Sequence, residues 1–133
     1  MLLVAAKTIL VAVAIFFVLL GLVALLRPNH ARRFLQGFAA SAPKHYAELV
    51  TRFVAGGATL IVAPHSTHSL ALTAFGWLLI LTTAVMAVVP WRVHRQFAEA
   101  AVPRALRFLP MIGIAALVLG GLLLWSVFIA SAA

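Results

Sequence analysis

The sequence contains no cysteine, which excludes disulfide bonds, thiolate metal sites and thiol redox chemistry. Acidic residues are nearly absent as well, since Glu48 and Glu99 are the only two. Neither glutamate has a second carboxylate at helical spacing, and the chain has no nucleophile elbow, P-loop or HExxH motif. We therefore expect a protein that is not an enzyme and that uses no cofactor.

Apolar residues are what the sequence has in excess. They make up 65% of the 133 residues, and only 9% are charged. Soluble domains have about 45–50% apolar and about 25% charged residues. A soluble fold of this length leaves too much of its surface exposed to hide so many apolar side chains. The composition therefore predicts an integral membrane protein.

Four apolar stretches are long enough to cross a hydrocarbon core as helices of about 20 residues. Their predicted ranges are 8–26, 46–63, 70–89 and 109–129. Pro28, Pro64 and Pro90 end the first three, and Pro110 suits the first turn of the fourth. The first stretch exceeds the apolar region of a signal peptide, so we expect it to be retained. The prediction is an all-α membrane protein, with one four-helix domain over residues 1–133.

The loop charges predict an orientation. Ten Lys and Arg residues against two acids give a net charge of +8. They concentrate in the loops after the first and third stretches, while the second loop and the C-terminal tail carry no charge. The positive-inside rule then places both basic loops in the cytoplasm of a bacterial inner membrane, with both termini outside. Because the cations flank apolar spans, anionic lipid headgroups are the expected partner, rather than nucleic acid.

The two halves of the chain align without a gap when Asn29 is matched to Arg92. Gly57 then matches Gly120, and Phe34 matches Phe97. This alignment predicts an internal duplication, with two tandem helical hairpins over about 1–63 and 64–133. A two-span unit keeps its orientation when it is copied, so the repeat would be parallel.

The two basic loops also have the pattern of short amphipathic helices. Apolar residues on one side are Ala31, Phe34, Leu35 and Phe38 in the first loop, and Val93, Phe97, Ala100 and Ala101 in the other. The candidate ligands for anionic lipid on the opposite sides are Arg32, Arg33, Arg92 and Arg95. Such helices lie in the membrane interface with the basic side towards the headgroups. The alternative is that these loops only determine topology.

Arg52 is the one strong charge at appreciable depth within a predicted span. Glu48 lies four residues earlier, so the two side chains can pair on one helix face. The alternative makes Arg52 a ligand for an anion or a lipid phosphate, facing the interior of the bundle.

His65 and His68 form an HxxH pattern in the predicted outer turn. Imidazoles bind zinc or copper, but a closed site needs more ligands than these two. They are weak metal candidates, and a neighbouring copy of the chain would have to complete the site.

Small residues in the second and fourth stretches predict close helix packing. They are Gly56, Gly57, Gly113, Ala116, Gly120 and Gly121. Small side chains let helix backbones approach closely in a membrane. The contacts could lie within one chain or between copies in a homo-oligomer.

Residues 21–64 contain a basic linker, Arg52 at the opening of the second stretch, and the Gly56-Gly57 pair after it. This segment resembles the helical-hairpin unit of small uncharacterised bacterial inner-membrane proteins of unknown function. The second half is similar but lacks an arginine that matches Arg52. The resemblance implies a location and a fold rather than an activity.

The function that we expect is that of a small membrane accessory or scaffold protein, associated with anionic lipid or with a larger membrane complex. The alternative is a small oligomeric channel or transporter for an anion or small metabolite. In that case Arg52 or the threonines of the spans would line its path.

Overall fold

The computed structural model describes residues 1–37 and 40–129, and every element in these ranges is helical. The helices are α1 (Leu2–Leu26), α2 (Pro28–Gly37), α3 (Ala42–Val62), α4 (Ser69–Val88), α5 (Trp91–Ala105) and α6 (Leu109–Phe128), with short 3-10 turns at Ala63–His65 and Leu106–Phe108. Four helical segments are long and apolar enough to cross a membrane. The predicted class of an all-α membrane protein is confirmed at this level.

Several helices begin at a proline, although Pro103 lies inside α5. Pro28 opens α2, Pro43 lies in the first turn of α3, and Pro90 precedes α5. Proline lacks a backbone N–H, which the first turn of a helix does not need but its interior does. The four predicted stretches correspond to α1, α3, α4 and α6. The main difference is that α1 begins at Leu2 rather than at residue 8.

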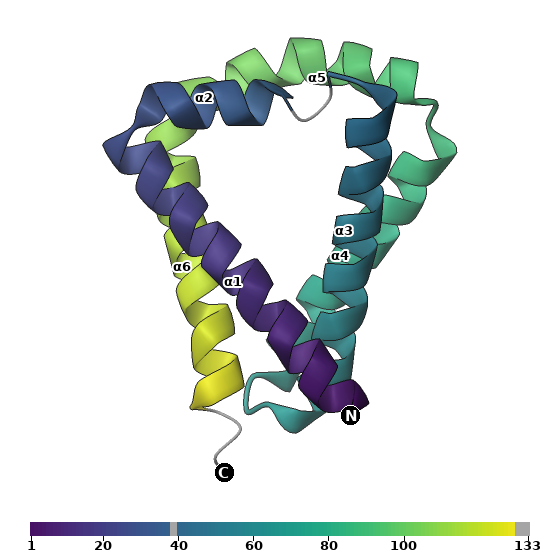
Figure 1. The fold of residues 1–133 in the computed structure, drawn as a ribbon, viewed down its shortest axis with the longest axis vertical. Helices are drawn as coiled ribbons and strands as arrows, with labels where there is room; N and C mark the ends of the chain where they lie inside the picture. The colour runs from purple at the N-terminus through teal and green to yellow at the C-terminus, as the bar shows by residue number, and fades with distance from the viewer. Residues whose placement is uncertain (38–39, 130–133) are drawn as a thin grey trace.

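The long helices form two pairs, with α1 beside α6 and α3 beside α4 (Figure 1). The pairs meet at the end of the molecule where the N-terminus lies, and they diverge towards the other end. Where they meet, an apolar cluster joins all four long helices, and it contains Leu10, Val62, Leu72 and Leu123. At the diverging end, α2 and α5 lie across the bundle. A second cluster there connects Ala24 and Ala31 to Leu106 and Leu109.

Glycines allow the close approach within each pair. A Cβ atom on Gly21 of α1 would lie 2.7 Å from the carbonyl oxygen of Gly113 on α6. One on Gly120 would lie 2.8 Å from the carbonyl oxygen of Ala14. In the other pair, Gly56 of α3 and Gly76 of α4 face each other, and a Cβ on either would lie 3.1 Å from the other's carbonyl oxygen. Between helices in lipid, such van der Waals contact takes the place of the hydrophobic effect.

These two pairs run between the predicted repeats rather than within them. The first half contains the long helices α1 and α3, and the second half contains α4 and α6. The first long helix of each half packs against the second long helix of the other half, which gives the pairs α1–α6 and α4–α3. Contact between α1 and α3, which belong to the same predicted hairpin, is concentrated where the pairs converge. The duplication itself stays a prediction.

Most of the apolar side chains predicted on α2 and α5 remain exposed. Ala31 is fully buried, whereas Phe34 is 46% exposed and Phe97 is 70% exposed. On α5 the buried residue is Ala98, which is not on the predicted apolar side. Phe38, also predicted on the apolar side of the first loop, lies outside the described residues. The two helices therefore present aromatic rings to the surroundings of the bundle.

Candidate functional site

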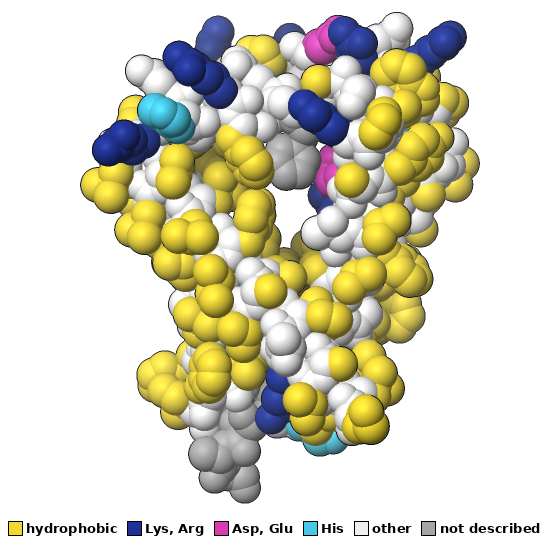
Figure 2. Space-filling view, in the orientation of Figure 1, with side chains coloured by type: hydrophobic (Ala, Val, Ile, Leu, Met, Phe, Trp, Pro, Cys, Tyr) yellow, Lys and Arg dark blue, Asp and Glu magenta, His cyan; other side chains and the backbone are white. Residues whose placement is uncertain are grey.

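Basic side chains gather at the end of the molecule that α2 and α5 cover (Figure 2). Arg32 and Arg33 on α2 are exposed, and neither forms an ion pair within the part of the chain that the structure describes. Arg95 on α5 is held 2.7 Å from Glu99 of the next turn. The guanidinium of Arg92 lies 5.9 Å from the centre of the Trp91 ring, within cation–π range. Four of the five predicted lipid or anion ligands thus lie at one end, with Arg32 and Arg33 the least engaged, and Arg52 is the fifth.

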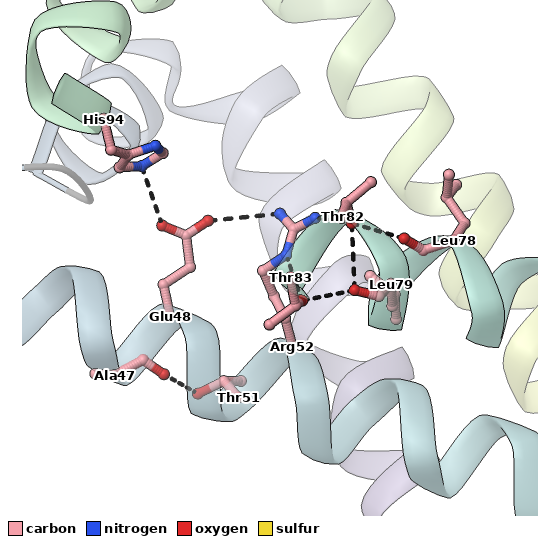
Figure 3. A network of polar contacts seen from close by, with 9 residues as sticks. All are labelled: Ala47, Glu48, Thr51, Arg52, Leu78, Leu79, Thr82, Thr83 and His94. Atoms are coloured by element: carbon pink, nitrogen blue, oxygen red, sulfur yellow. Dashed lines mark hydrogen bonds and ion pairs between the residues drawn. The ribbon is translucent and has the colours of Figure 1, made fainter. Parts of the chain in front are cut away.

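Arg52 lies deeper, at the centre of a polar network between α3 and α4 (Figure 3). Its Nη2 donates a 2.7 Å hydrogen bond to Oγ1 of Thr82, and its Nε donates one of 3.4 Å to Oγ1 of Thr83. Its Nη1 lies 3.5 Å from Oε1 of Glu48, which is the ion pair that the sequence spacing predicts. The guanidinium is therefore engaged on three of its nitrogens.

The two threonines can accept these bonds because their own protons are used elsewhere. The hydroxyl of Thr82 donates to the carbonyl of Leu78 at 2.6 Å, and that of Thr83 donates to the carbonyl of Leu79 at 2.6 Å. Each hydroxyl oxygen then has a lone pair left for Arg52. The arrangement places the cation of α3 against acceptors on α4, inside the membrane-spanning part of the pair.

Glu48 also reaches towards α5. Its Oε2 lies 3.9 Å from Nε2 of His94, and the His94 ring lies 4.8 Å from that of His45. His45 is only 2% exposed, and its Nδ1 has no hydrogen-bond partner in the described ranges. The network therefore connects three helices. Sequence reasoning missed both histidines, because His45 and His94 are far apart in the chain and follow no spacing rule.

The positive charge of Arg52 is neutralised within this network by the carboxylate of Glu48. A carboxylate and two hydroxyls surround the guanidinium, so the cost of moving the charge out of water is partly offset. The side chain of Arg52 keeps 31% of its surface exposed. Acting as an anion ligand, Arg52 would have to exchange some of these partners for the anion.

The predicted metal candidates His65 and His68 lie in the turn between α3 and α4. Nδ1 of His65 lies 3.3 Å from the carbonyl oxygen of Ile61 in the preceding helix, and His68 precedes the first residue of α4. Within residues 1–37 and 40–129, no three side chains of the metal-binding types come close enough to hold an ion.

Small residues predicted to pack helices fall into two groups. Gly56, Gly113 and Gly120 lie in tight helix contacts, and Ala116 is buried. By contrast, a Cβ atom on Gly57 or Gly121 would meet nothing within 4 Å.

An apolar hollow lies in the angle between α1 and α2, and we call it the α1–α2 groove. It encloses about 270 Å³. Its lining comes from Phe16, Leu19, Leu20 and Val23 of α1, and from His30, Ala31 and Phe34 of α2.

The chain matches no protein-family model, no curated protein and no solved structure. The resemblance to small inner-membrane proteins therefore stays a prediction.

Proposed function

We propose that the protein is a small, non-enzymatic accessory or scaffold protein of a bacterial inner membrane. It binds anionic lipid at the end covered by α2 and α5, or it associates with a larger membrane complex. The observation that carries this proposal is the gathering of basic side chains on two helices that lie across one end of the spans (Figure 2).

The physical basis is the negative surface potential of the cytoplasmic leaflet. A Lys or Arg close to that surface contributes about 1 kcal/mol of attraction to anionic lipid. Arg32 and Arg33 have no acidic partner among the described residues, so lipid phosphates can neutralise them. Exposed rings of Phe34 and Phe97 on the same helices can enter the acyl region beside the headgroups. This orientation puts both termini outside the cytoplasm.

Association with other membrane helices is supported by the open glycines. Gly57 on α3 and Gly121 on α6 leave their backbones accessible from outside the bundle. Small residues at such positions allow a neighbouring helix to approach closely. A partner protein or a second copy could use either surface.

Extraction from native membranes in mild detergent tests the proposal. Native mass spectrometry should show anionic phospholipid, and a protein partner, retained in stoichiometric amounts. The variant Arg32→Gln, Arg33→Gln should lose much of the lipid. The variant Lys7→Gln, which removes a cation near the N-terminal end of α1, is the control. Isolated chains that carry neither lipid nor protein would contradict the proposal.

An oligomeric channel or transporter is the alternative, and one observation favours it. Figure 2 shows an opening between the two helix pairs, with acidic and basic side chains at its edge. Flux of small anions into proteoliposomes, abolished by Arg52→Ala, would support a transport function. Absence of flux for a panel of inorganic and organic anions would favour the accessory function.

A further inference from the structure

We propose that the α1–α2 groove holds one acyl chain of an anionic glycerophospholipid, whose phosphate binds to a row of cations at the rim of the groove. This inference rests on the proposed function, because it gives the general association with anionic lipid one defined site. Neither the apolar lining nor the row of cations would suffice alone; their adjacency indicates a ligand that is apolar at one end and anionic at the other.

The apolar part of the site comes from two helices that meet at an angle. Phe16 on α1 and Phe34 on α2 have ring centres 6.2 Å apart, so the walls of the groove approach each other. Leu19 and Val23 on α1 remain 55% and 37% exposed, which leaves their surfaces free to contact a ligand. An aliphatic chain buries this surface without needing hydrogen bonds.

The lining of the groove suits an aliphatic ligand. Six of its seven residues are apolar, and His30 is the seventh, so the groove offers few partners to a polar group. A lipid acyl chain is the membrane component that needs no hydrogen bonds.

The row of cations consists of Arg27, His30 and Arg33, spaced three residues apart. His30 lines the groove. The backbone N–H groups of His30 and Ala31 donate to the carbonyl of Arg27 at 3.0 and 3.2 Å, so Arg27 lies directly before the first turn of α2, next to His30. Arg33 is exposed on the following turn of α2.

The position of the row suits a phosphate. It follows directly after Leu26, the last residue of α1, and so lies where a span reaches the headgroup region. The sequence has no acidic residue before Glu48, so nothing in α1 or α2 competes with the phosphate for these cations. These cations attract a lipid with a net negative charge more strongly than a zwitterionic lipid.

Photocrosslinking in nanodiscs tests the proposal on the full chain. The probes are phosphatidylglycerol and phosphatidylcholine, each with a diazirine in one acyl chain, and the adducts are mapped by mass spectrometry. The phosphatidylglycerol probe should label residues 16–34 in preference to the outer faces of α4 and α6. Added inorganic phosphate should not compete, because a free phosphate lacks the chain that fills the groove.

Two variants address the two parts of the site. Leu19→Trp fills the groove and should abolish labelling there, whereas Leu122→Trp at a 57% exposed position on α6 should leave it unchanged. Arg27→Gln, Arg33→Gln should weaken competition by unlabelled phosphatidylglycerol about tenfold. Lys7→Gln removes a cation near the N-terminal end of α1, away from the groove, and it should have no such effect.

Three results would overturn the inference. They are equal labelling by both probes, labelling spread evenly over all outward faces, and labelling that Leu19→Trp does not change. If anionic lipid still co-purifies in those cases, the proposed function stands and only the site is wrong. If no anionic lipid is retained at all, both fail.

Discussion

Nη2 of Arg52 on α3 donates a 2.7 Å hydrogen bond to Oγ1 of Thr82 on α4. The same two helices also meet at Gly56 and Gly76, where their backbones come close. The α3–α4 pair is thus joined by small-residue packing and by a charged group that reaches across the contact. The fourth long helix, α6, meets α1 through glycines and apolar side chains.

Removing Glu48 should destabilise the protein, because it leaves the Arg52 cation without its counter-charge. We expect Glu48→Leu and Arg52→Leu each to lower the free energy of unfolding by about 1–3 kcal/mol, since the pair is only partly exposed. The double variant should be close to the wild type, because two apolar side chains can replace an ion pair. Unfolding in mixed detergent micelles measures this. Additive losses in the double variant would contradict the interpretation.

Thr82→Val should cost about 0.5–1.5 kcal/mol, because it removes the acceptor for Nη2 of Arg52 and keeps the shape. Thr51→Val is the matched control, because the Thr51 hydroxyl is exposed and donates to the carbonyl of Ala47 in its own helix at 2.8 Å. Thermal unfolding in detergent should separate the two variants. Equal losses of stability in the two variants would mean that the hydrogen bond between Arg52 and Thr82 contributes nothing measurable to the free energy of unfolding.

Gly120→Ala should be destabilising by about 1–3 kcal/mol, because the added methyl group would lie 2.8 Å from the carbonyl oxygen of Ala14. In thermal unfolding of the isolated chain in detergent, Gly121→Ala should be neutral or slightly stabilising, since open space surrounds that position within the chain and alanine favours helix. The same contrast should hold for Gly56→Ala and Gly57→Ala, with a smaller loss because part of the contact is the flexible Ile80 side chain. A loss for Gly121→Ala as large as for Gly120→Ala would show that α6 also packs against another chain.

His65→Ala, His68→Ala should bind zinc and copper no differently from the wild type. Two histidines supply too few ligands, and Nδ1 of His65 lies beside the carbonyl of Ile61. Calorimetry on the purified protein measures this. Tight binding by the wild type that the double variant loses would show that neighbouring copies complete a site.

The Glu48–Arg52 pair could be predicted because both residues lie on one helix, where a spacing of four fixes their distance. The link to His94 could not, since it depends on how α5 folds back over α3. Likewise, Gly56 and Gly57 look equivalent in the sequence, but they lie about 100° apart around the helix. Only the position of α4 decides which one packs.

The positions of the four apolar spans and of the basic loops can be read from the amino-acid sequence alone. Long apolar segments must be removed from water, and in lipid each has to satisfy its own backbone as a helix. The pairing of α1 with α6 and of α3 with α4 is visible only in the folded chain. Lipid tails solvate every apolar helix face about equally well, so apolarity alone does not select a partner helix. The partners are determined by close packing at small residues, which lie on helices that are distant in the chain.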